Sequence, residues 1–134
     1  MIVVLIVGIL AAIAVPAYLD QVRQSRWAEA KEALQRVMQA QEQYRTGENI
    51  YTTDLDGNLG FNNDPVQSRP AFWYAISAAT CGPAGAPGIT DCVALVATPV
   101  NDQTNDECGN FVLDSRGLRE LAGADAGVTA ADCW

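Results

Sequence analysis

Residues 1–20 read MIVVLIVGILAAIAVPAYLD, and this stretch decides the fold of the chain. No charged residue precedes Asp20. In helical conformation, residues 1–19 would span about 28 Å at a rise of 1.5 Å per residue, close to the hydrocarbon thickness of a membrane. The sequence therefore predicts an apolar transmembrane helix at residues 1–19.

The second half of this helix is rich in small residues, namely Gly8, Ala11, Ala12, Ala14, Pro16 and Ala17. Small side chains let neighbouring helices approach closely. The stretch has no basic residue before its apolar core, and that core is longer than the core of a secretory signal. We therefore expect a segment that meets other helices and not a cleaved signal peptide.

Residues 20–46 are amphipathic. Apolar or large residues recur there at spacings of three and four, at Trp27, Ala30, Leu34, Val37, Met38, Gln41 and Tyr44. Neither glycine nor proline interrupts residues 17–46. The pattern predicts a stem helix that continues from the apolar segment, packs its stripe against a head domain and ends at Gly47. Glu32 and Arg36 have the spacing of a favourable ion pair on that helix.

The first 20 residues resemble the N-terminal helix of type IV pilins, which has a glycine, an alanine pair, a proline, a tyrosine and an aspartate in this order. The resemblance implies that Gly8, Pro16, Tyr18 and Asp20 belong to a helix that bundles in a filament core. In that family a Phe-Thr-Leu-Ile-Glu-Leu stretch and a short basic leader precede this helix. We expect the given sequence to begin a few residues inside the mature helix, so no residue is assigned the family's helix-initial glutamate.

Residues 47–134 form the expected globular head. Residues 47–70 are rich in Gly, Asn, Asp, Thr and Pro and predict a long loop. Strands are expected at residues 71–79, 92–98, 110–114 and 118–121. The predicted fold is α+β, with the long helix packed on a four-stranded antiparallel sheet. Residues 97–99, 106–109, 113–117 and 133–134 resemble the corresponding part of type IVa pilins and related minor pilins.

All four cysteines lie in the head, at Cys81, Cys92, Cys108 and Cys133. The spacing lacks the close pairs of a zinc site, so disulfides and an oxidising compartment are expected. Four cysteines allow three pairings. Cys81 follows one predicted strand and Cys92 opens the next, so this pair would close a Gly/Pro-rich hairpin loop. That leaves Cys108 with Cys133, as in the C-terminal disulfide of similar pilins.

The charge distribution argues against general nucleic-acid binding. The net charge is −8, and residues 46–134 hold three arginines against twelve acidic residues. Phosphate binding needs clustered Lys or Arg, so DNA is a disfavoured partner. The chain has no histidine, so Ser-His and Cys-His nucleophile pairs are excluded. We expect no catalysis, no catalytic residues, no cofactor and no metal.

Two oxygen-rich stretches are candidates for calcium sites. Asp54, Asp56 and Asn58 alternate, but Gly57 and Pro65 occupy the wrong positions for an EF-hand. The second stretch comprises Asn101, Asp102, Asn105, Asp106 and Glu107. Calcium there would favour a type II secretion pseudopilin.

The leading hypothesis is a structural subunit of a type IV pilus, assembled as a homo-oligomeric helical filament through the N-terminal helix. The resemblance implies a bacterial inner-membrane stage and then an extracellular pilus, with prepilin peptidase, a platform protein and a motor ATPase as partners. Adhesion, twitching motility and DNA uptake are roles of such filaments. The alternatives are a minor pilin that binds DNA or a receptor, a type II secretion pseudopilin, and a membrane-tethered binding domain without an assembly role.

Glycine and proline make residues 8–16 the weakest part of the predicted helix. In an isolated subunit we expect a continuous helix that bends near Pro16. In a filament, where neighbouring chains shield the backbone, we expect some or all of Ile9 to Ala17 to be non-helical.

Overall fold

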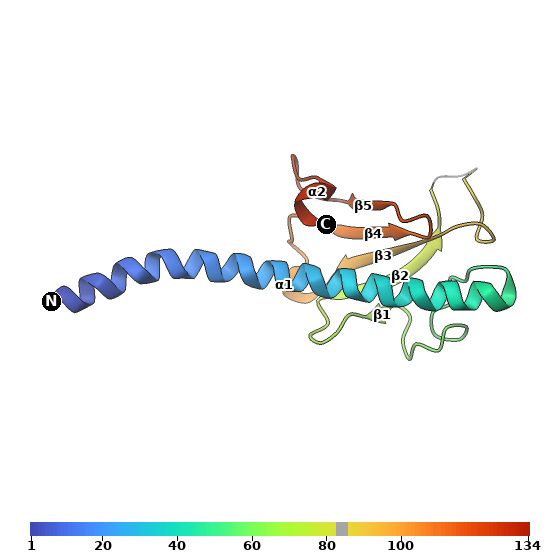
Figure 1. The fold of residues 1–134 in the computed structure, drawn as a ribbon, viewed down its shortest axis with the longest axis horizontal. Coiled ribbons are helices and arrows are strands. Elements are labelled where there is room, and N and C mark those ends of the chain that lie inside the picture. The colour runs from blue at the N-terminus through green and yellow to red at the C-terminus, as the bar shows by residue number, and fades with distance from the viewer. Residues whose placement is uncertain (83–85) are drawn as a thin grey trace.

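The computed structural model describes residues 1–82 and 86–134, and its elements form an α+β fold (Figure 1). A long helix, α1 (Ile2–Glu48), precedes an antiparallel sheet whose strand order follows the sequence. The strands are β1 (Val66–Gln67), β2 (Tyr74–Thr80), β3 (Val93–Pro99), β4 (Asn110–Asp114) and β5 (Arg119–Ala122). A 3-10 turn, η1 (Asn101–Gln103), follows β3, and the short helix α2 (Ala130–Cys133) lies near the C-terminus.

The sheet has five strands, so the predicted count of four is wrong. The additional strand, β1, lies inside the segment predicted as loop and pairs with β2 through Val66 opposite Ile76. A two-residue strand is too short to show an alternating pattern in sequence. Pairing with the edge of β2 creates it, and Val66 becomes buried as a result.

Helix α1 runs unbroken through Pro16 and bows along its N-terminal half (Figure 1). The continuous helix expected for an isolated subunit is confirmed. The predicted end at Gly47 is early, because the helix continues to Glu48. Asn49 adopts the left-handed conformation there (φ 59°) and its N–H donates to the Arg45 carbonyl at 2.8 Å. Asparagine therefore supplies the left-handed cap in place of glycine.

The C-terminal half of α1 packs on the sheet. Four residues of the predicted stripe are buried, Ala30, Leu34, Val37 and Gln41, and Glu29 and Ala33 are buried beside them. The other predicted stripe residues, Trp27, Met38 and Tyr44, are only half-buried. The sheet contributes Tyr74, Ile76, Leu95 and Phe111, all fully buried, to the same core. Burial of this apolar area is the main stabilising contribution to the head.

A buried carboxylate delays the start of β2. Ala71 and Trp73, predicted as strand, donate their backbone N–H groups to Glu29 of α1 at 3.2 and 3.1 Å. The Ser68 hydroxyl also donates to Glu29. Because these N–H groups bond to the helix, they cannot join the sheet ladder, and β2 begins only at Tyr74.

Both predicted disulfides are present in the structure. Cys81 bonds Cys92 with a Cα–Cα distance of 5.7 Å, and Cys108 bonds Cys133 with a Cα–Cα distance of 6.1 Å. The first bond joins the end of β2 to the start of β3, although residues 83–85 of the predicted hairpin loop lie outside the described residues. The second ties α2 to the segment before β4.

Candidate functional site

The N-terminal half of α1 is an exposed apolar rod. Residues 1–21 are all exposed, and the helix is long and apolar enough to cross a membrane. Gly8, Pro16, Tyr18 and Asp20 all lie on this rod, where Tyr18 is 69% exposed. An apolar surface of this length is unfavourable in water, so it requires lipid or other protein chains around it.

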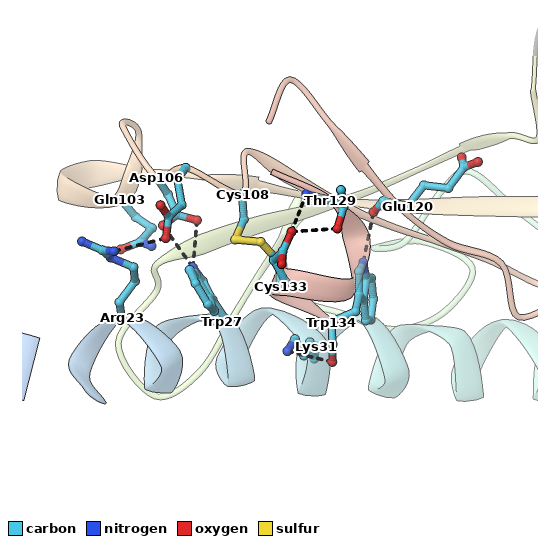
Figure 2. Close-up of a disulfide and its surroundings, with 12 residues drawn as sticks. Arg23, Trp27, Lys31, Gln103, Asp106, Cys108, Glu120, Thr129, Cys133 and Trp134 are labelled. Carbon is cyan, nitrogen blue, oxygen red and sulfur yellow. Dashed lines mark hydrogen bonds and ion pairs between the residues drawn. A yellow bond between two sulfur atoms is a disulfide. The ribbon is translucent and has the colours of Figure 1, made fainter. Parts of the chain in front are cut away.

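A polar network holds the head where this rod ends. The Trp27 indole N–H lies 3.0 and 2.9 Å from the two Asp106 carboxylate oxygens, and the Arg26 guanidinium donates to the Gln103 side chain at 3.0 Å. Arg23 pairs with Glu107 at 3.1 Å. Figure 2 shows Trp27 rising from α1 toward Asp106, beside the Cys108–Cys133 disulfide. The start of the head is thereby fixed to one turn of the helix.

Tyr74 completes this network from the sheet. Its hydroxyl accepts from the Gln103 side chain at 3.3 Å and donates to Asp106 at 3.4 Å. Burial, and then the neighbouring Asp106 carboxylate, raise the pKa of the Tyr74 phenol far above its ordinary value of 10.0. The phenol therefore stays protonated and remains a donor to Asp106.

The oxygen-rich stretches have structural partners. Asp54 accepts the Gly57 N–H at 2.8 Å, and the Asn58 amide donates to Thr52 at 2.8 Å, so both stabilise a turn. Asp106 is held by Trp27, as described above. Among the described residues, the one group with converging metal-ligand types is Cys81, Cys92 and Asp114, and its two sulfurs bond each other.

A basic pocket lies between α1 and β1. It has a volume of about 270 Å³ and is lined by Arg36, Gly60, Phe61, Asn62, Asn63, Val66, Gln67 and Arg69. The Arg36 guanidinium donates weakly to the Gln67 carbonyl at 3.4 Å and lies 6.0 Å from the Phe61 ring centre. Its Nε is buried and has no hydrogen-bond partner among the described residues. The lining contains two guanidinium groups and no carboxylate.

The other arginines of the head are engaged elsewhere. Arg116 makes an ion pair of 2.6 Å with Asp114, and Arg119 stacks on Trp134 at 5.4 Å. Sequence reasoning missed the pocket because it counted Arg36 with the stem and Arg69 with the head. Among the described ion pairs, the expected Glu32–Arg36 pair is absent, because Arg36 turns toward β1 instead.

The opposite edge of the sheet carries two exposed carboxylates and one arginine, Arg119 of β5, which stacks on Trp134. Glu120 lies on β5, and Asp125 lies in the turn that follows it. Both residues are exposed, and within the described part of the chain neither side chain has an ion-pair partner. Figure 1 shows β1 and β5 on opposite sides of the head. The two edges of one sheet therefore differ in charge.

The long exposed helix and the disulfide-tied sheet define the class of type IV pilins. Residues 16–112 match the family described as "Type IV minor pilin ComP, DNA uptake sequence receptor". The chain belongs to this family and is a type IV pilus subunit. No protein among the curated sequences matches it.

Solved structures share the fold. A type IV pilin from Shewanella oneidensis aligns with a TM-score of 0.52 and 20% identity, covering 84% of this chain and 97% of its own. The non-core minor pilin PilV of Neisseria meningitidis aligns with a TM-score of 0.54 and 17% identity, covering 80% and 93%. The predicted family and α+β fold are confirmed.

Proposed function

We propose that this chain assembles into a homo-oligomeric filament by bundling residues 2–19 with the same segment of other copies. The observation that carries the proposal is the difference along α1, whose first half is entirely exposed while its second half lies in the head. Gly8 has no side chain, and nothing in the subunit lies within 4 Å of where its Cβ would stand, so another helix can approach the backbone there closely. Pro16, Tyr18 and Asp20 belong to the same interface.

Before assembly, the same segment holds the subunit in the bacterial inner membrane, with the head outside the cytoplasm. The two disulfides suit that oxidising side. Prepilin peptidase, a platform protein and a motor ATPase are the partners of this route. In the assembled filament, some or all of Ile9 to Ala17 loses its helical hydrogen bonds, because neighbouring chains shield the backbone. A filament map with unbroken helix through Ile13 would contradict this step.

A charge placed on the exposed half tests the proposed assembly. In a host that holds the assembly machinery, Leu10→Lys should remove the protein from sheared filaments, since a lysine at mid-membrane costs about 2.5–3.5 kcal/mol. Gln21→Lys adds the same charge at the end of the exposed segment and should leave assembly intact. Negative-stain images and the amount of protein in the sheared fraction are the measurements. Wild-type protein that never enters filaments would refute the proposal.

DNA reception is the second candidate function. The matched family's description and the carboxylate-free pocket at Arg36 and Arg69 favour it, while the net charge of −8 opposes long-range attraction to phosphate. Filter binding of the full chain in detergent, with duplex DNA and a salt titration, tests it. Receptor activity predicts binding that falls steeply with salt, whereas no retention at low salt excludes it.

A further inference from the structure

The two edges of the sheet carry groups of opposite charge that no ion pair within the described residues occupies. On the β1 side, the pocket presents Arg36 and Arg69 with the amides of Asn62 and Asn63. On the β5 side, the carboxylates of Glu120 and Asp125 stand exposed. Because the strand order follows the sequence from β1 to β5, these surfaces are separated by the full width of the sheet.

A filament brings unlike surfaces of identical subunits together. Subunits related by a helical operation meet head to tail, so one patch on a copy contacts a different patch on the next. An interface of this kind needs two complementary surfaces on one chain. The pocket with Arg36 and Arg69 on one side of the head, and the exposed carboxylates of Glu120 and Asp125 on the other, satisfy that requirement.

The basic pocket contains two guanidinium groups but no carboxylate to accept their hydrogen bonds. Among the described residues, the one hydrogen bond that the Arg36 guanidinium gives to the backbone runs from Nη2 to the Gln67 carbonyl and is long at 3.4 Å. Guanidinium groups bind carboxylates through paired, charge-assisted hydrogen bonds. A carboxylate entering beside Arg69 would give the terminal nitrogens of Arg36 a charged acceptor, which the pocket lining does not contain.

We propose that the Arg36–Arg69 pocket of one copy receives the carboxylates of Glu120 and Asp125 from the β5 edge of a neighbouring copy. The inference rests on the proposed filament assembly and deepens it by naming a contact between heads. Each head then supplies its own two carboxylates to one neighbour and binds the two carboxylates of another neighbour. The contact therefore repeats along the filament. The apolar helices supply the burial, and this contact sets the register of the heads.

Other anions fit the surroundings less well. Arg36 lies 17 residues beyond the apolar segment on the same helix, or about 26 Å along it, which is too far for a lipid headgroup of the membrane that holds residues 1–19. A DNA phosphate would meet a head with twelve acidic residues. A carboxylate from a second copy makes its contact at short range, after the helices have brought the subunits together.

Carbodiimide coupling of assembled filaments tests the contact. This reagent joins an amine to a carboxylate only where the two touch. The chain has one lysine, Lys31, so Arg69→Lys adds a single new amine while it keeps the charge and the filament. We expect coupled dimers and longer ladders on denaturing gels, with linked peptides that join position 69 to Glu120 or Asp125. One copy cannot form this link within itself, because four strand spacings of about 4.8 Å separate the edges.

Arg45→Lys is the matched control, since it places an amine at the far end of α1, away from the pocket. It should produce no link to Glu120 or Asp125.

Charge reversal gives a second measurement. Arg69→Glu should lower filament yield about tenfold, and the added changes Glu120→Arg and Asp125→Arg should restore most of it.

Three results would overturn the inference. Arg69→Lys filaments without a link to Glu120 or Asp125 would remove the proposed contact while the filament function stands. Arg69→Gln filaments of normal yield that lose salt-dependent DNA retention would make the pocket a phosphate site instead. Wild-type protein that is absent from filaments would remove both the contact and the filament function.

Discussion

The two halves of α1 have similar helical structure and opposite surroundings. Residues 2–19 are apolar yet exposed, whereas residues 29–41 hold all six buried residues of the helix, Glu29 and Gln41 among them. The more hydrophobic half is thus the one that the subunit leaves uncovered. The comparison teaches that burial within this chain follows the position of the sheet and not hydrophobicity alone. The uncovered half obtains its burial from lipid or from other subunits.

Truncating one leucine in each half of α1 should lower the stability of the head by very different amounts. Leu34→Ala removes a fully buried side chain and should lower the free energy of unfolding of the head by about 3–5 kcal/mol, because a cavity remains. Leu10→Ala, at a residue that is 61% exposed, should change it by less than about 0.5 kcal/mol. Denaturation of the full chain in detergent, followed by tryptophan fluorescence, measures both. Equal losses would contradict the division of the helix.

Removing a disulfide should lower the free energy of unfolding of the head, because the unfolded chain gains conformational entropy when the ring is opened. Cys108→Ser with Cys133→Ser opens a ring of 25 residues and should cost roughly 3–4 kcal/mol by loop entropy. Cys81→Ser with Cys92→Ser opens a ring of 11 residues and should cost less, about 2.5–3 kcal/mol. The same denaturation measurement applies. A larger loss from the smaller ring would show that packing outweighs chain entropy here.

The buried carboxylate of α1 should matter more than its exposed neighbour. Glu29→Gln replaces an acceptor oxygen with an amide donor and leaves one of the Ser68, Ala71 and Trp73 donors unsatisfied, at a cost of about 1–3 kcal/mol. Glu32→Gln, one turn away on the exposed face, should fall within about 0.5 kcal/mol of wild type. Equal free energies of unfolding for the two variants would show that the Glu29 carboxylate does not stabilise the segment before β2.

The smallest effect is expected from Asp114 in the turn after β4. Burial alone would raise the pKa of this carboxyl, but hydrogen bonds from Leu118 and Arg116 and the Arg116 charge hold it below its ordinary value of 3.8. Because the folded pKa is the lower one, the stabilisation is complete above the unfolded pKa and is lost as the pH falls through the folded pKa. Asp114→Asn should cost about 1 kcal/mol at neutral pH and should flatten the loss below about pH 4. Unfolding at a series of pH values measures this, and parallel profiles would contradict it.

Much of the fold could be predicted from the sequence because it is encoded in local patterns. The absence of charge before Asp20 predicts the apolar helix, and spacings of three and four predict its buried stripe at Ala30, Leu34 and Val37. The strand at Asn110–Asp114 was predicted with correct bounds. The disulfide pairing followed from strand order together with the pilin resemblance.

One candidate site could be predicted from the sequence, and the other could not. Gly8, Pro16, Tyr18 and Asp20 were expected on an assembly helix, and their place in a filament core stays a prediction. The pocket at Arg36 and Arg69 had no signal in the sequence, because the two arginines are 33 positions apart and belong to different elements. Their proximity arises only when β1 pairs with β2 beside α1.

By itself, the sequence determined the apolar rod, the amphipathic stem and the alternation of strands, since each depends on residues within a few positions of one another. The tertiary structure alone decided that β1 exists, that Glu29 holds the backbone before β2, and that Arg36 and Arg69 meet in one pocket. These features depend on contacts between distant segments. Their free energy comes from burial and pairing that exist only after the chain has folded, so no local pattern records them.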